Sequence, residues 1–95
     1  MPFGLYKISV LIMKTHNLKT HPEYFNEVML GHKPFELRKN DRDFSLGDVL
    51  CLEEWDPMDK DCTGREFYVK VSYIFRGGKF GLDPDMVIMG LEYQN

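Results

Sequence analysis

Apolar and polar residues alternate along several short segments of the chain, a pattern typical of half-buried β-strands. Residues 5–18 form the first such segment. The clearest segment is EFYVKVSYIF, residues 66–75. Its alternation predicts one shared face for Phe67, Val69, Val71, Tyr73 and Phe75. FELRK (35–39), DVLCLEEW (48–55) and MVIMGLEY (86–93) are three further strand candidates, and GGKFG (77–81) is a turn between the last two predicted strands.

The period changes at THPEYFNEVMLG, residues 20–31. Thr20 followed by Glu23 is a possible capping box, Pro22 suits a first helical turn, and Gly31 suits the position just past a helix end. An apolar stripe would consist of Tyr24, Phe25, Val28 and Met29. The segment therefore predicts a helix of about two turns.

The predicted order is one strand, one short helix and then four strands. A chain of 95 residues has room for one domain and no second core, so we treat residues 1–95 as a single domain. Five short strands and one helix favour a mixed α+β, mostly-β fold, a small curled sheet or β-barrel.

Composition supports a packed globular domain, because 43% of the residues are hydrophobic and 14% are aromatic. No apolar run is long enough to cross a bilayer. The opening MPFGLYKISVLIMK lacks a small-residue cleavage site and is interrupted by Lys7 and Ser9, which favours a strand over a signal peptide. Cys51 and Cys62 form no CxxC pair, so we expect a reduced, cytoplasmic protein.

The net charge of −3 argues against general affinity for nucleic acid. The charge is unevenly distributed, however. Residues 31–42 contain four cationic and two acidic side chains, whereas residues 53–61 contain five acidic side chains and one lysine. A local basic segment therefore remains compatible with an anionic ligand.

The basic segment lies in GHKPFELRKNDRDFSLGD, residues 31–48. Alternate residues of a strand share a face about 6.6 Å apart. This predicts Glu36, Arg38 and Asn40 on one side, with Phe35 and Leu37 entering the core. One interpretation is a solvated strand face with a Glu–Arg pair worth at most about 1 kcal/mol. The other is a row of polar groups that meets a ligand.

The spacing G-x-K-x-x-E-x-R in GHKPFELR, carried by Gly31, Lys33, Glu36 and Arg38, resembles the signature of the ASCH domain, a relative of the PUA fold. HNLK ahead of the helix, KNDRDFSLGD after the signature and TGREF at 63–67 resemble a small bacterial and phage branch of that superfamily. The resemblance runs from about Met13 to the C-terminus and leaves residues 1–12 outside it.

This resemblance implies a PUA-like β-barrel with a cleft beside the helix, and a role in binding RNA or a modified nucleotide. It implies that Lys33, Glu36 and Arg38 line the cleft and that Gly31 shapes the turn before it. Lys33 suits a phosphate, and Arg38 suits a phosphate or a base edge. An ionised Glu36 could accept a hydrogen bond from an amino group such as that of cytosine. We expect no cofactor.

An enzyme is the first alternative, because one ASCH branch resembles an amidohydrolase acting on acetylated cytidine. A threonine there occupies the position of Glu36, so this chain has Lys33 without that hydroxyl. Thr15 or Thr63 could substitute only if the fold brought either one to Lys33. A protein-interaction adaptor is the second alternative, with neither RNA affinity nor turnover.

Other residues extend the candidate binding set. His16 and Lys19 could reach the cleft, although capping or packing would explain His16 equally well. Trp55 could stack on a base or pack at the barrel rim. Asn40 and Arg42 continue the signature strand, and Arg42 could also organise the turn together with Asp41, Asp43 and Asp48. The spacings of His16, His21 and His32 match no metal-site pattern.

Overall fold

The computed structural model describes residues 13–93, within which one strand, one helix and four further strands follow in the predicted order. The elements are β1 (Thr15–Thr20), α2 (Pro22–Met29), β2 (Phe35–Lys39), β3 (Val49–Asp56), β4 (Asp61–Arg76) and β5 (Met86–Tyr93). Most of the predicted first strand, from residue 5 onward, falls in residues 1–12, outside the described part. Met13 and Lys14 precede β1 and are not in a strand.

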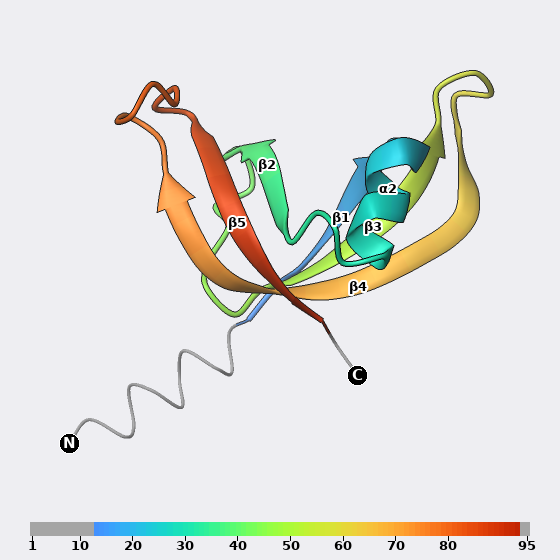
Figure 1. The fold of residues 1–95 in the computed structure, drawn as a ribbon, viewed down its shortest axis with the longest axis horizontal. Helices are drawn as coiled ribbons and strands as arrows, with labels where there is room; N and C mark the ends of the chain where they lie inside the picture. The colour runs from blue at the N-terminus through green and yellow to red at the C-terminus, as the bar shows by residue number, and fades with distance from the viewer. Residues whose placement is uncertain (1–12, 94–95) are drawn as a thin grey trace.

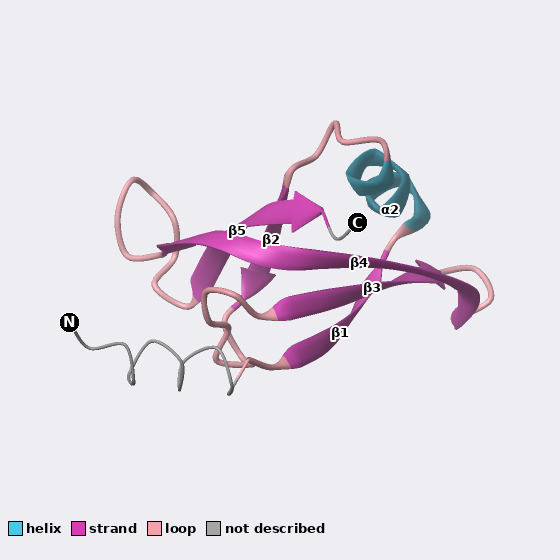
Figure 2. Cartoon of the chain, turned by 90° about the horizontal axis from the view of Figure 1, so that it is seen from below, coloured by secondary structure: helices cyan, strands magenta, loops and turns pink. Residues whose placement is uncertain are grey.

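All five strands belong to one sheet in the order β1-β3-β4-β5-β2. β1 pairs with β3 in parallel, and the other neighbours are antiparallel. The sheet curls into a half-barrel, and α2 lies inside its curve (Figure 1). The view from below shows that β5 and β2 cross behind β4 at a steep angle (Figure 2). The mostly-β fold class with one short helix after the first strand is therefore confirmed, and β1 and β2 are the two edges of the sheet.

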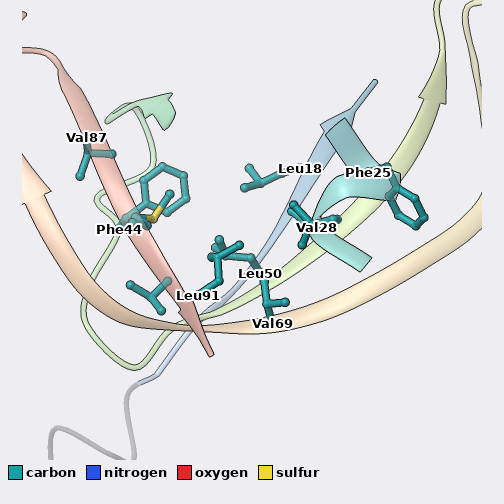
Figure 3. Packing of buried hydrophobic residues seen from close by; sticks show 11 residues of the cluster. Leu18, Phe25, Val28, Phe44, Leu50, Val69, Val87 and Leu91 are labelled. Atoms are coloured by element: carbon teal, nitrogen blue, oxygen red, sulfur yellow. The ribbon is translucent and has the colours of Figure 1, made fainter. Parts of the chain in front are cut away.

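The core fills the concave side of this sheet (Figure 3). Its buried members come from every strand except β2, from α2, and from the loop before β3: Leu18, Phe25, Val28, Phe44, Leu50, Leu52, Val69, Val71, Val87, Met89 and Leu91. The burial alternates strictly along β1, with His16, Leu18 and Thr20 inward. The short helix presents Phe25 and Val28 to the core, whereas Tyr24, predicted on the same stripe, is 49% exposed.

A β-bulge changes the pattern of β4. Val71 lies opposite Leu91, but Tyr73 lies opposite Gly90, so one extra residue is inserted between the two pairs. The extra residue reverses the inward face: Ile74 packs against the core, and Tyr73 is 63% exposed. The prediction that Tyr73 shares a face with Val71 is therefore wrong.

The helix ends as predicted but begins differently. Gly31 adopts φ 80°, its N–H donates to Val28 O, and the N–H of His32 donates to Glu27 O, the pair of bonds that defines a Schellman motif. The predicted capping box is absent, because the N-cap is His21 and it makes no side-chain capping bond. Thr20 instead belongs to β1, and its hydroxyl donates to Leu18 O.

Within residues 13–93, no helix has the length and apolar character needed to cross a membrane. Both cysteines are free thiols. Cys51 is buried and Cys62 is exposed. Burial raises the pKa of the Cys51 thiol, which makes it a poor nucleophile.

Candidate cationic cleft at the open seam of the barrel

β2 turns its charged face inward, opposite to the prediction. Glu36 is 2% exposed, while Phe35 and Leu37 are 42% and 48% exposed. The assignment of Phe35 and Leu37 to the core is therefore wrong. The reason is that β2 is an edge strand on the curled sheet: its Glu36 side faces the concave interior, where two cations compensate the carboxylate.

Glu36 is held between those two cations. Lys33 Nζ lies 2.9 Å from Glu36 Oε1, and Arg38 Nε lies 2.8 Å from Glu36 Oε2. Lys33 Nζ also donates to Phe35 O at 2.9 Å. The side chains of Lys33 and Arg38 are 20% and 25% exposed, so each cation reaches solvent while the carboxylate does not. The three signature side chains therefore converge, as predicted.

Arg38 also joins the two edges of the sheet. Its Nη1 atom donates to Lys19 O and its Nη2 atom to Thr20 Oγ1, both at 3.1 Å. Arg42 Nη1 donates to Asn17 O at 2.7 Å. β1 and β2 are not paired by a backbone ladder, so these guanidinium groups occupy the seam where a closed barrel would have backbone hydrogen bonds.

A cavity of about 420 Å³ lies at this seam. This volume is within the range of about 300–1,000 Å³ typical of small-molecule sites. It is lined by Lys19, Thr20, His21, Tyr24, Lys33, Phe35, Glu36, Leu37 and Arg38. Two permanent cations, Lys33 and Arg38, flank the one carboxylate of this lining, which makes the cleft locally positive in a protein of net negative charge.

The cations retain donors for a ligand. A lysine carries three N–H bonds and an arginine five. Among residues 13–93, Lys33 uses two of its donors and Arg38 uses three. One N–H of Lys33 and two of Arg38 are thus left for an anion.

Aromatic rings flank the same cations. Lys33 Nζ lies 4.9 Å from the ring centroid of Phe35 and 5.9 Å from that of Tyr24, both within cation–π range. The imidazole of His21 stacks on Tyr24 at 6.4 Å between centroids. Because Tyr24 and Phe35 are partly exposed and line the cavity, they offer surfaces on which a planar ligand can stack.

Four residues of the predicted binding set lie outside the cavity lining. His16 is buried, where its ring packs edge-on against Phe44. Asn40 Oδ1 accepts from the N–H of Phe44, and Arg42 holds β1, so both organise the seam and turn. Trp55 is half-buried beneath Lys19, whose Nζ lies 4.1 Å from its ring centroid. Of the additional candidates, only Lys19 lines the cavity.

The hydroxyl groups and histidines are also separated. Thr15 and Thr63, considered above as substitutes for a nucleophile, do not line the cavity, whereas Thr20 does. His32 is exposed and contacts Glu27 at the end of the helix, whereas His16 is buried in the core. Within residues 13–93, no three metal-ligating side chains gather into a possible metal site.

Glu54 is another buried carboxylate, and it was not singled out from the sequence. Glu54, which is 5% exposed, accepts from Thr63 Oγ1 at 2.7 Å and from Arg65 Nη1 at 3.3 Å. Arg65 continues to Asn26 Oδ1 at 3.4 Å and lies over the ring of Phe25, so this cluster ties the β3–β4 hairpin to α2. The available signal was the period of β3, because Glu54 follows Leu50 and Leu52 on the core face.

These features define a mostly-β half-barrel with a cationic cleft at its unpaired seam. The family described as "Domain of unknown function (DUF3850)" matches residues 15–91, and the chain belongs to this family. It is also 37% identical over 62 residues to the "Uncharacterized 12.9 kDa protein in GpA 3'region" of Escherichia phage P2. That alignment covers 65% of this chain and 55% of the phage protein, so the chain matches about half the length of this relative.

Proposed function

We propose that the cleft binds RNA or a modified nucleotide, with Lys33 and Arg38 donating to a phosphate group. The observation that carries this proposal is the convergence of Lys33 and Arg38 on one cavity, with donors left over after the internal hydrogen bonds are made. Phosphate oxygens are the natural acceptors for such donors. Tyr24 and Phe35 would supply stacking surface for a base.

Glu36 has a positioning role in this proposal. Each of its oxygens already accepts from a cation, and its side chain is 3% exposed. We therefore assign Glu36 the role of holding Lys33 and Arg38 in place before the ligand arrives, rather than that of accepting a hydrogen bond from an amino group of the ligand. Such preorganisation reduces the side-chain entropy that is lost on binding.

We also infer that this family is a branch of the ASCH superfamily with a PUA-like fold. The curled five-stranded sheet is consistent with that relationship, as is the convergence of the signature residues on one cavity. The relationship favours a nucleic-acid component as the ligand.

The internal hydrogen bonds favour binding over hydrolysis. Thr20 carries the one hydroxyl of the cavity lining besides that of Tyr24, and it donates to Leu18 O while accepting from Arg38. The ammonium of Lys33 is paired with Glu36. Neither arrangement leaves a base beside a nucleophilic hydroxyl, as acyl transfer would require.

Fluorescence anisotropy with labelled single-stranded RNA, measured over a series of salt concentrations, tests this function. We expect affinity to fall with salt, and Lys33→Ala to weaken binding and reduce the slope of log K against log salt by about 1. Lys79→Ala is the matched control, because it removes the same charge from an exposed loop position that does not line the cavity. Equal losses in the two variants would contradict a site at the cleft.

The same preparations distinguish the alternatives. Release of acetate from N4-acetylcytidine, abolished by Lys33→Ala, would establish the hydrolase instead. A melting temperature that no nucleoside, nucleotide or RNA raises would favour the adaptor.

A further inference from the structure

β2 directs alternate peptide groups toward β5 and toward the cleft. The N–H of Leu91 donates to Pro34 O at 3.0 Å, and the N–H of Asn40 donates to Asp85 O at 2.7 Å. In an antiparallel pair, alternate residues direct both main-chain groups to the partner strand, so these two bonds define which residues of β2 face β5. The main-chain N–H and C=O groups of Glu36 and Arg38 therefore face β5. The main-chain groups of Leu37, which lies between these two residues, face the free edge of the sheet.

The hydrogen bonds between β5 and β4 indicate the same alternation of peptide directions. Leu37 lies opposite Ile88 in the register. The N–H of Gly77 donates to Met86 O, so the main-chain groups of Met86, and with them those of Ile88 two residues later, point toward β4. The peptide groups of Ile88 are thus directed away from Leu37.

Side chains cap three main-chain carbonyls at the edges of the seam. Arg42 donates to Asn17 O, Arg38 donates to Lys19 O, and Lys33 donates to Phe35 O. Among residues 13–93, no side chain forms a hydrogen bond with the N–H or the C=O of Leu37. Leu37 lines the cavity. The N–H and C=O of Leu37 therefore lie side by side on this strand edge of the cleft, and neither has a hydrogen-bond partner among residues 13–93.

We propose that Leu37 binds the hydrogen-bonding edge of one unpaired nucleobase through its main-chain N–H and C=O, while the phosphate of the same nucleotide binds at Lys33 and Arg38. The inference rests on the proposed function and narrows it. The Watson–Crick edge of a nucleobase places a donor next to an acceptor, and in a duplex both are already used. The ligand is therefore a free nucleotide or a single-stranded residue, and the cavity volume suits one nucleotide.

Leu37→Pro tests the main-chain contact directly. It deletes an N–H that the fold does not use, and proline is tolerated on an edge strand when its nitrogen faces outward. Leu37→Ala is the matched control, because it removes the side chain and keeps the N–H. Isothermal titration with the four nucleoside 5′-monophosphates and ribose 5-phosphate separates the base contribution from the phosphate contribution.

We expect the wild type and Leu37→Ala to bind at least one monophosphate about tenfold more tightly than ribose 5-phosphate. Leu37→Pro should remove most of this preference and leave the affinity for ribose 5-phosphate unchanged. An intact preference in folded Leu37→Pro would overturn the inference. A wild type that binds RNA and ribose 5-phosphate without preferring any base would overturn it too, and would leave the proposed function standing.

A second measurement on the wild type covers the case in which Leu37→Pro does not fold. The preferred monophosphate is compared with its derivative methylated on the ring nitrogen of the Watson–Crick edge. We expect about a tenfold loss of affinity, and equal affinities would reject the contact. If neither RNA nor any of these phosphates binds the wild type, the proposed function fails together with the inference.

Discussion

The Nε2 atom of His16 lies 2.8 Å from Oδ2 of Asp48, and both side chains are buried. The pair joins the start of β1 to the start of β3. The carboxylate of Asp48 also accepts from the backbone N–H groups of Lys14 and Ser45, at 3.1 and 3.0 Å. Asp48, expected to organise a turn, thus connects the parallel strands to the turn before β3.

The stability of the fold should depend on the ionisation of Asp48. Burial alone would raise the pKa of this carboxyl, but the hydrogen bonds from His16, Lys14 and Ser45 outweigh burial and leave the pKa below its ordinary value. A carboxyl with a lower pKa in the folded state stabilises the fold above its unfolded pKa, and this contribution disappears as the pH falls through the folded pKa. We therefore expect the free energy of unfolding in urea to decrease below about pH 4.

Asp48→Asn should lower the free energy of unfolding by about 2–4 kcal/mol at pH 7 and should flatten this acid dependence. Asp43→Asn is the control, because Asp43 is exposed and asparagine tolerates its positive φ of 51°. We expect the control to change stability by less than about 0.5 kcal/mol. An unchanged acid slope in Asp48→Asn would assign the pH dependence to other carboxyl groups.

The elements could be predicted because their signals are local. Alternation located β2 to β5, and the positive φ of Gly31 agrees with its predicted place after the helix. The bulge after Val71 could not be predicted, because it depends on how β5 pairs with β4 across the sheet. The predicted start of the helix was wrong for a similar reason, because Thr20 accepts a hydrogen bond from Arg38 on a distant strand instead of capping the helix.

The site could be predicted only in part. Lys33, Glu36 and Arg38 come together because they are neighbours on one short segment. Alternation defines the two faces of that segment, but it does not say which face is inside, and apolar Phe35 suggested the wrong one. Lys19 was predicted to reach the cleft, and it is among the residues that line it. Tyr24 was predicted on the apolar stripe of the helix; its place in the cleft depends on how α2 packs inside the curved sheet, which the sequence pattern does not reveal.

Glu36→Gln should destabilise the protein and loosen the cleft. The substitution removes the negative charge that holds Lys33 and Arg38, and leaves two partly buried cations without a counter-charge. We expect a loss of about 1–3 kcal/mol, or roughly 5–20 °C in melting temperature for a domain of this size. Lys39→Gln is the control, since the contact of Lys39 with Asp85, at 3.8 Å, is exposed on both sides. Equal effects of the two substitutions on the melting temperature would contradict the bridging role of Glu36.

Arg65→Ala should weaken the attachment of α2 to the sheet. Arg65 binds buried Glu54 and also reaches Asn26 on the helix. We expect about 1–2 kcal/mol of destabilisation, with faster hydrogen exchange concentrated in the amides of α2. Arg76→Ala, at an exposed position at the far end of the same strand, is the control. Uniformly faster exchange across the whole chain would indicate a global loss of stability instead.

Gly77→Ala should be among the most damaging small substitutions, although the φ of Gly77 is not positive. A Cβ atom at this position would overlap the carbonyl of Asp83, a backbone group that cannot rotate away. Because Gly77 N–H also donates to Met86 O at 2.9 Å, relief of the overlap would disturb the end of the β4–β5 ladder. We expect the free energy of unfolding in urea to fall by about 2 kcal/mol or more.

Gly78→Ala is the control that separates close approach of the chain from backbone conformation. Gly78 has φ 99° and open space where an added Cβ would lie, so its backbone strain should cost only about 1–2 kcal/mol. A larger effect at Gly78 than at Gly77 would show that backbone conformation, rather than close approach of the chain, determines the need for glycine in this turn.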